Sequence, residues 1–244
     1  MDNELVYVLH TRKYRETSQL VDLLGRNAGR LRVVARGSRA KARGKRPSTM
    51  ALQPFQPFFA SWRGKSDLKS LRGHEPAGSV ISLQGDALYI GFYVNELLTR
   101  LLPEGIAHAP LFDRYARLIT LLAHGVDVEA HLRIFELSFL DDMGYGLDLY
   151  TDHADGSPID SSCDYLFHPG EGFTRIEISP TSPQRNMFCG AHLLAIAEQE
   201  FDSPMVRKSA KRLLRQALEA HLGQRPLHSR ELFKKMIDVS GAPS

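Results

Sequence analysis

Residues 4–37, ELVYVLHTRKYRETSQLVDLLGRNAGRLRVVARG, decide the fold of the first part of the chain. Short apolar runs of strand length alternate here with turn-forming residues such as Asn27-Ala28-Gly29. The same pattern continues as far as residue 75. The runs that it predicts as strands are 4–10, 18–26, 31–37, 51–62 and 67–75. Five short strands in succession predict a small antiparallel barrel over residues 1–78.

The remainder of the chain, 79–244, has a helical hydrophobic period. Glycine or proline follows several of its apolar stretches, as is typical of helix ends. The predicted helices are 87–102, 110–125, 128–144, 190–201, 203–222 and 229–237. An irregular insertion at 147–185 is rich in Asp, Ser, Gly and Pro, and YLFHPGEGFTRIEI within it predicts a β-hairpin that turns at 170–172. The fold class is therefore α+β: a barrel, then a mainly helical domain with a small hairpin insertion.

The overall composition favours a globular protein of the reducing cytosol. Of 244 residues, 43% are hydrophobic and 24% are charged, and no apolar run is long enough to span a membrane. The first residues, MDNELVYVLH, lack the pattern of a secretory signal. Two cysteines, Cys163 and Cys189, cannot build a disulfide framework, although a single bridge between them is a less favoured alternative.

Charge is segregated along the chain. Residues 1–75 hold 16 Lys and Arg against 6 Asp and Glu, a net of +10. Residues 76–205 hold 6 against 19, a net of −13, and residues 206–244 hold 9 against 3, a net of +6. This division favours a dedicated polyanion-binding face, and solvated surfaces without a partner are the alternative. We also consider that the acidic middle masks the basic first part until a partner binds.

The strongest candidate for such a face is the predicted barrel with its basic loop, GSRAKARGKRPSTM at 37–50. Clustered cations repel one another, and a phosphate backbone relieves this repulsion with release of counterions. Aromatic rings between the cations could stack bases, and we expect Tyr14 and Trp62 to do so because Phe55 and Phe58 can instead fill the barrel. The cations predicted to bind DNA are Arg12, Lys13, Arg15, Arg36, Arg39, Lys41, Arg43, Lys45, Arg46, Arg63 and Lys65.

A second basic surface is predicted on the helix at 203–222. It carries Arg207, Lys208, Lys211, Arg212 and Arg215 at spacings of three and four residues. The functional interpretation is contact with DNA or with an acidic peptide, and the alternative is an ordinary solvated face.

No catalytic or metal-binding constellation is apparent. Asp141 and Asp142 are neighbours and point in different directions on a helix, so they do not form a two-carboxylate site. The acids and histidine of Asp152–Asp155 have no recognisable ligand spacing. The chain lacks a phosphate-binding loop that ends in Lys-Ser or Lys-Thr. We therefore predict no enzyme activity, no cofactor and no metal.

Several segments, taken together and in order, resemble the RecO family of bacterial recombination mediators. They cover nearly the whole chain, and the ordered set is specific although each segment alone is weak. The segments are YVLHTRKYRETSQLVDLL, GRLRVVARGSRA, LQPFQPF, GFYVNELLTRLL, LRIFELSFLDDMGYGLDL and AKRLLRQALEAHLGQRPLHSRELFKKM.

The resemblance implies an OB-type barrel followed by a helical domain, in a bacterial, cytoplasmic and nucleoid-associated protein. It implies binding of single- and double-stranded DNA and annealing of complementary strands. It also implies contact with RecR and with the C-terminal tail of single-strand-binding protein, which together load RecA onto coated strands in the RecF pathway.

Two further features depend on the resemblance. Many family members carry a four-cysteine zinc module after the GYGLDL stretch, but the segment 150–168 retains only Cys163, so a hairpin packed by aromatic residues is expected in its place. The tail-binding pocket is expected to use Arg133, with Leu98 and Phe112 as apolar walls. An ordinary contact with Glu136 on the same helix is the alternative for Arg133.

Two other functions compete with the mediator interpretation. The first is a nucleic-acid-binding adaptor with the same barrel but no mediator activity, because such barrels host many functions. The second is a metal-dependent nuclease that uses Asp141, Asp142 or the acids of the 152–155 loop.

Overall fold

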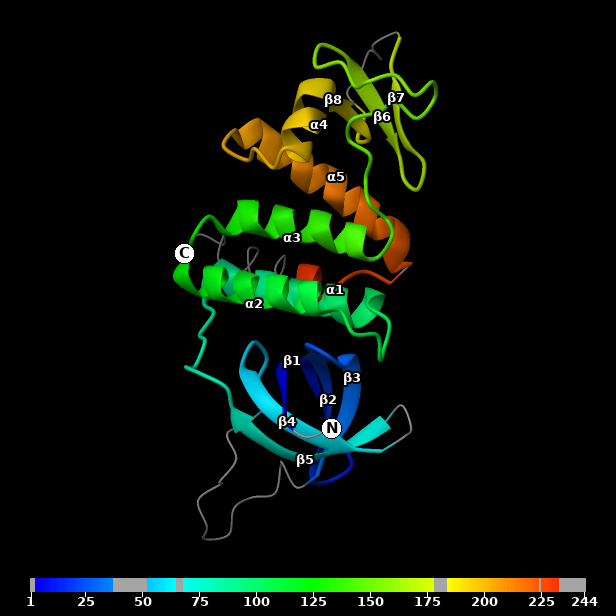
Figure 1. Cartoon of the computed structure of the whole chain (residues 1–244). Coiled ribbons are helices and arrows are strands. Elements are labelled where there is room, and N and C mark those ends of the chain that lie inside the picture. Colours follow the sequence, from blue (N-terminus) through cyan, green and yellow to red (C-terminus); the bar gives the residue numbers. More distant parts are fainter. Residues whose placement is uncertain (1–2, 37–51, 65–67, 178–183, 224, 233–244) are drawn as a thin grey trace. The chain divides into compact units, whose positions relative to one another are not determined.

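The computed structural model describes residues 3–36, 52–64, 68–177, 184–223 and 225–232 (Figure 1). The chain forms two compact units, 1–126 with 226–244 and 127–225. The sequence predicts a domain boundary at 78/79, where the barrel ends. The first compact unit extends further, because it also contains the two helices that follow the barrel. The boundary at 78/79 therefore stays a prediction. None of the described helices is long and apolar enough to cross a membrane.

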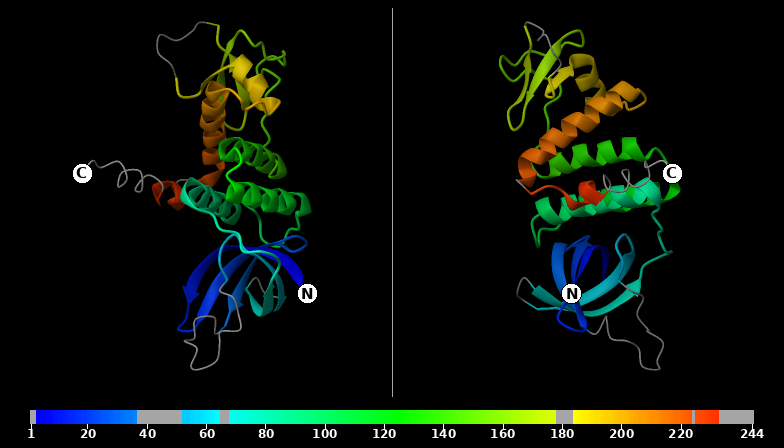
Figure 2. Two further views of the ribbon diagram at one scale, coloured as in Figure 1. Left: turned by 90° about the vertical axis from the view of Figure 1, so that its left-hand side faces the viewer. Right: turned by 180° about the vertical axis from the view of Figure 1, so that it is seen from behind.

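The first unit contains a closed five-stranded barrel (Figures 1 and 2). Its strands are β1 (Glu4–Tyr14), β2 (Ser18–Gly25), β3 (Gly29–Ala35), β4 (Pro57–Arg63) and β5 (Leu68–Pro76). The strand order is β1-β2-β3-β5-β4, closing back on β1, and only the β3–β5 pair is parallel. This is the Greek-key order of an OB-type barrel, so the predicted fold class is confirmed.

Strand alternation fills the barrel. Inward-facing residues alternate along β1 to β4, and the apolar ones are almost completely buried, while Leu71 of β5 is partly buried against them. The inward-facing core residues are Val6, Val8, Val21, Leu23, Leu31, Val33, Ala35, Phe58, Ala60 and Trp62, with Leu52 from the segment before β4. Phe58 therefore fills the barrel interior and does not stack a base, as the sequence led us to expect for one of the two phenylalanines Phe55 and Phe58.

Helices α1 (Gly85–Leu101) and α2 (Ala109–His124) pack on the outer face of β1. The Tyr7 ring lies 5.5 Å from the ring of Phe112 and 5.2 Å from that of Tyr115, measured between centroids. Asn95 on α1 donates to the carbonyl of Leu9 at 2.9 Å and accepts from the Tyr115 hydroxyl at 2.7 Å. Burial raises the pKa of Tyr115 well above its usual range, so this hydroxyl stays a neutral donor.

A carboxylate on α1 holds the returning C-terminal segment. Glu96 accepts hydrogen bonds from the backbone N–H groups of His228 and Ser229, both at 2.9 Å, and from the Ser229 hydroxyl at 2.7 Å. Arg100 also donates to the carbonyl of Pro226 at 3.1 Å. Burial alone raises the pKa of Glu96, but the hydrogen bonds from Ser229 and His228 outweigh it and leave this pKa below its ordinary value.

Glu96→Gln is expected to lower the free energy of unfolding by about 1 kcal/mol at neutral pH. The pKa of Glu96 is lower in the folded protein than in the unfolded chain. Its contribution to the free energy of unfolding is therefore fully present above the pKa of the unfolded chain, and it is lost as the pH falls through the pKa of the folded protein. Denaturant unfolding of wild type and variant should therefore differ at neutral pH and converge in acid. Glu75→Gln, at an exposed position on β5, is the control. A Glu96→Gln effect that is independent of pH would contradict this account.

The second unit combines helices with a small sheet. Its helices are α3 (Val128–Asp142), α4 (Gly190–Ala197) and α5 (Pro204–Leu222), and its strands are β6 (Asp164–His168), β7 (Gly172–Arg175) and β8 (Met187–Cys189). The predicted hairpin is confirmed as β6–β7, but β8 was not predicted and makes the sheet three-stranded. Ser203 occupies the N-cap of α5 as expected, although its side chain makes no capping hydrogen bond.

Aromatic residues hold the small sheet together. Tyr165, Phe167 and Phe173 are buried in it as the sequence predicts, and Phe188 of β8 joins them. The rings of Phe167 and Phe173 lie 5.1 Å apart, and each lies 6.3 Å from the ring of Phe188. Within the described ranges, no three His, Cys, Asp or Glu side chains gather as a metal site would require.

Candidate nucleic-acid interface

Strand register brings basic residues of β1 and β3 to one end of the barrel. Lys13 near the end of β1 pairs with Gln19 on β2. Gln19 in turn pairs with Ala35, the last residue of β3, and Arg36 follows directly. The end of β1 and the end of β3 therefore lie on either side of the beginning of β2.

The other side of the barrel contributes Arg63 to the same end. Val34 on β3 pairs with Ser70 on β5, and Ser70 pairs with Arg63, the last residue of β4. We call this surface the basic end. Its described cations are Arg12, Lys13, Arg15, Arg36 and Arg63, and all five are exposed.

The cations of the basic end have no carboxylate partner among the described residues. Arg15 lies in the left-handed region, with φ 53°, and its guanidinium sits 5.2 Å from the centre of the half-buried Tyr14 ring. This contact leaves the guanidinium protons available to an anion. The other predicted cations, Arg39, Lys41, Arg43, Lys45, Arg46 and Lys65, lie outside the described residues and stay predictions.

The expectation that Trp62 stacks a base is wrong. Trp62 is only 5% exposed and packs inside the barrel with Phe58 and Ala60, because these three residues share the inward face of β4. Phe55 is also buried and packs against Phe92 of α1 with the two rings tilted, their centroids 5.2 Å apart. The sequence shows that this strand carries Phe58, Phe59 and Trp62, but it does not show which of them face inward.

Other arginines of the barrel are neutralised within the first unit. Arg32 donates to Asp22 at 2.9 Å, and Arg30 pairs with Glu104 at 3.0 Å. Burial raises the pKa of Asp22, but the interactions with His10 and Arg32 outweigh it and hold this pKa below its usual value. Similarly, Arg26 makes a two-pronged ion pair with Asp113, at 3.0 and 2.9 Å. These ion pairs leave the basic end as a distinct positive region of the barrel.

The predicted basic face of α5 is mostly engaged within the second unit. Arg207 pairs with Asp127 through two hydrogen bonds of 2.8 Å, and Lys211 lies 3.8 Å from Glu129. Arg215 pairs with Glu219 at 2.8 Å. Contact with DNA therefore has less support here than the alternative of an ordinary structural and solvated face.

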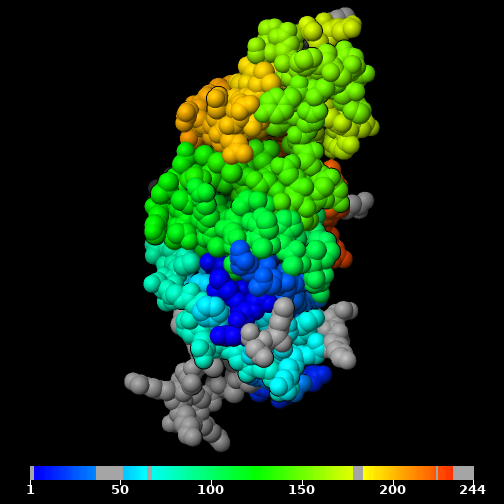
Figure 3. Space-filling view, in the orientation of Figure 1, coloured from blue at the N-terminus to red at the C-terminus, as the bar shows by residue number. Residues whose placement is uncertain are grey.

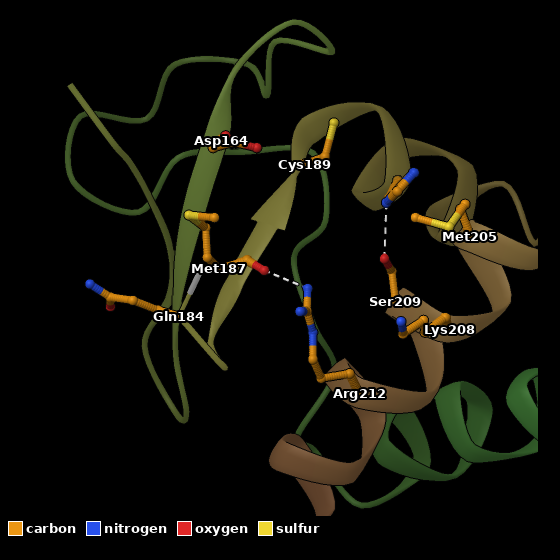
Figure 4. A pocket seen from close by; sticks show the side chains of 9 residues that line it. Asp164, Gln184, Met187, Cys189, Met205, Lys208, Ser209 and Arg212 are labelled. Atoms are coloured by element: carbon orange, nitrogen blue, oxygen red, sulfur yellow. Dashed lines mark hydrogen bonds between the residues drawn. The ribbon is translucent and has the colours of Figure 1, made fainter. Parts of the chain in front are cut away.

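A pocket between β8, α4 and α5 contains another of these cations (Figure 4). Arg212 donates to the carbonyl of Met187, and its guanidinium lies 4.4 Å from the centre of the Phe188 ring. Burial lowers the pKa of Arg212 from its ordinary value. On the same pocket wall His192 and Ser209 share a hydrogen bond of 2.9 Å. The polar side chains of this pocket wall are therefore already hydrogen-bonded within the second unit.

The residues predicted to bind a protein tail are all buried. Arg133 is 5% exposed and pairs with Glu136 at 2.8 Å, which is the alternative that the sequence left open. Leu98 and Phe112 are buried in the first unit, where Phe112 packs on Tyr7. Because Arg133 belongs to the second unit, a pocket shared by the three residues stays a prediction.

The acids of the 152–160 loop act as structural acceptors. Asp152 is buried and accepts from the backbone N–H groups of Ala154 and Arg175, both at 2.8 Å. Asp155 and Asp160 each accept from the backbone N–H two residues further on, as in Asx turns. These hydrogen bonds give the three carboxylates a structural role, so this loop lends no support to the nuclease alternative.

The fold and this interface define a class: an OB-barrel protein with a basic end suited to a polyanion, followed by a helical region. The chain belongs to the RecO family of DNA repair and recombination proteins. It matches the family descriptions Recombination protein O N terminal over residues 1–80 and Recombination protein O C terminal over residues 82–231.

Curated relatives match over almost their whole length. The chain is 43% identical over 231 residues to DNA repair protein RecO of Haemophilus influenzae (strain PittGG), covering 95% of each chain. It is 43% identical over 233 residues to the protein of the same name from Cellvibrio japonicus (strain Ueda107), covering 96% of this chain and 97% of the relative. The corresponding protein of Pseudomonas aeruginosa (strain LESB58) is 44% identical over 230 residues, covering 94% of both.

Proposed function

We propose that this protein is a recombination mediator of bacterial DNA repair that binds strands and partner proteins without turnover. The observation that carries the proposal is the basic end, where five exposed cations have no carboxylate partner in the described part of the chain. A phosphate backbone supplies the missing anions and releases counterions as it binds. The six predicted cations between residues 39 and 65 would extend this surface.

Binding at the basic end accounts for both single- and double-stranded DNA, because phosphate contacts carry no sequence information. A surface that neutralises two complementary strands lowers their mutual repulsion and so favours annealing. In the proposed pathway the protein acts with RecR and helps to load RecA onto strands coated by single-strand-binding protein. This activity belongs to the bacterial cytoplasm and nucleoid.

The proposed contact with the tail of single-strand-binding protein involves Arg133 with Leu98 and Phe112. The charge of Arg133 supports it, because a terminal carboxylate needs a cationic partner. Glu136 already pairs with this cation, so the incoming tail has to compete with an internal partner.

The test is fluorescence-detected annealing of complementary DNA strands without ATP. The protein is expected to accelerate annealing at low salt, and its affinity for each strand should fall steeply as salt rises. A protein that binds strands but leaves annealing at its spontaneous rate would instead be the adaptor, particularly if it preferred RNA. Absence of binding at low salt would refute both functions.

A further inference from the structure

The outer face of β2 and β3, which usually carries the ligand in OB-type barrels, is closed in this protein. Leu20, Asp22 and Leu24 point away from the barrel interior and are nevertheless buried. The segment after α1 packs here as well. The Arg30 side chain donates to the carbonyl of Leu102 at 2.7 Å, and the Arg30 carbonyl accepts from the N–H of Gly105 at 2.8 Å. A nucleic acid strand therefore needs another route across the barrel.

The outer face of β4 and β5 is open. Phe59 points outward, since its neighbours in β4 face the core, and its side chain is 40% exposed. Beyond it lie Ser61 and its paired residue Gly73. A Cβ atom placed on Gly73 would meet only the Ser61 hydroxyl oxygen within 4 Å, at 3.6 Å, among the described atoms. Small residues thus leave open space beside the exposed Phe59 ring. The strands β4 and β5 that form this face are drawn in cyan (Figures 1 and 3).

This open face is continuous with the basic end. Arg63 ends β4, and the exposed Arg72 lies at the irregularity in the β4–β5 register. The rise of a strand places Phe59 about 13 Å from Arg63, a distance that a few nucleotides cover. Among the described residues of β4 and β5, the acid on this path is Glu75, which pairs with Phe59 at the far end. Phosphates are therefore favoured near Arg63 and Arg72, and an uncharged base is favoured at Phe59.

We infer that a DNA single strand leaves the basic end along the outer face of β4 and β5 and stacks a base on Phe59. The inference rests on the proposed function and deepens it by giving the strand a path and a stacking residue. The sequence pattern pointed to Tyr14 and Trp62 as stacking residues and gave Phe59 no such role. Only the inward position of Trp62 reveals that Phe59 faces solvent.

The test measures binding of a short fluorescent oligothymidylate to wild type, Phe59→Ala and Phe59→Trp. Phe59→Ala is expected to weaken binding about tenfold, because one stacked base is lost. Phe59→Trp should bind as tightly as wild type, and the indole fluorescence that it adds should be quenched by an unlabelled oligothymidylate. An oligonucleotide that carries abasic sugars in place of bases should bind wild type and Phe59→Ala equally.

Phe92→Ala is the matched control, since Phe92 on α1 is also a partly exposed phenylalanine of the same unit. Undiminished binding by Phe59→Ala, or an added indole signal that stays unquenched in Phe59→Trp at saturation, would overturn the path while leaving the proposed function intact. If wild type did not bind the oligothymidylate at low salt, the proposed function and this inference would both fail.

Discussion

Arg12→Glu/Arg36→Glu is expected to lower affinity for single-stranded DNA at least about tenfold at low salt. Both side chains are exposed at the basic end without a carboxylate partner in the described residues, so their reversal removes two phosphate contacts and adds repulsion. The plot of log affinity against log salt should also become shallower, by about 0.7 for each lost contact. Fluorescence anisotropy titrations over a salt series measure both quantities.

The control for this prediction is Arg117→Glu/Lys208→Glu. It changes the net charge equally, at exposed positions that belong to α2 and α5 and not to the barrel strands. We expect it to lower affinity slightly and to leave the salt slope unchanged. Equal losses from both double variants would mean that net charge, rather than a defined interface, governs binding.

Gly29→Ala is expected to destabilise the first unit by about 4 kcal/mol or more. Gly29 begins β3 with φ at 67°, a conformation that side chains disfavour. A Cβ atom there would also lie 1.9 Å from the carbonyl oxygen of Ile106, so the backbone between α1 and α2 would have to move. Denaturant unfolding and the yield of folded protein measure the effect.

Gly105→Ala separates the two causes. Gly105 also has a positive φ, at 77°, but a Cβ there would meet nothing within 4 Å in the described structure. Its cost should be only that of the backbone conformation, about 1–2 kcal/mol. If the two alanine variants were equally stable, the close approach of Ile106 to β3 would be disproved.

Periodicity was sufficient to predict the barrel and the main helices. The hydrophobic period changes from that of strands to that of helices near residue 80, and this change can be read directly from one sequence. Residues 187–189 were missed because three residues are too few to show a period, and β8 forms only by pairing with β6. The left-handed Gly125 that ends α2 was predicted, since such glycines act locally.

The candidate site was only partly predictable because charge neutralisation depends on distant partners. Arg207 looks like a free cation on a basic helix, yet its partner Asp127 lies 80 residues earlier. Likewise, Arg30 is neutralised by Glu104, 74 residues away. The exposure of Arg12, Lys13 and Arg15 could be predicted because it depends only on the local turn after β1, and all three are found at the surface.

The most direct test of the mediator function uses complementary strands precoated with single-strand-binding protein. Annealing is followed by fluorescence with wild type and with Arg12→Glu/Arg36→Glu. Acceleration by wild type, and its loss in the double variant, is the result that the account predicts. If wild type left the coated strands at their spontaneous rate, the mediator role would be contradicted.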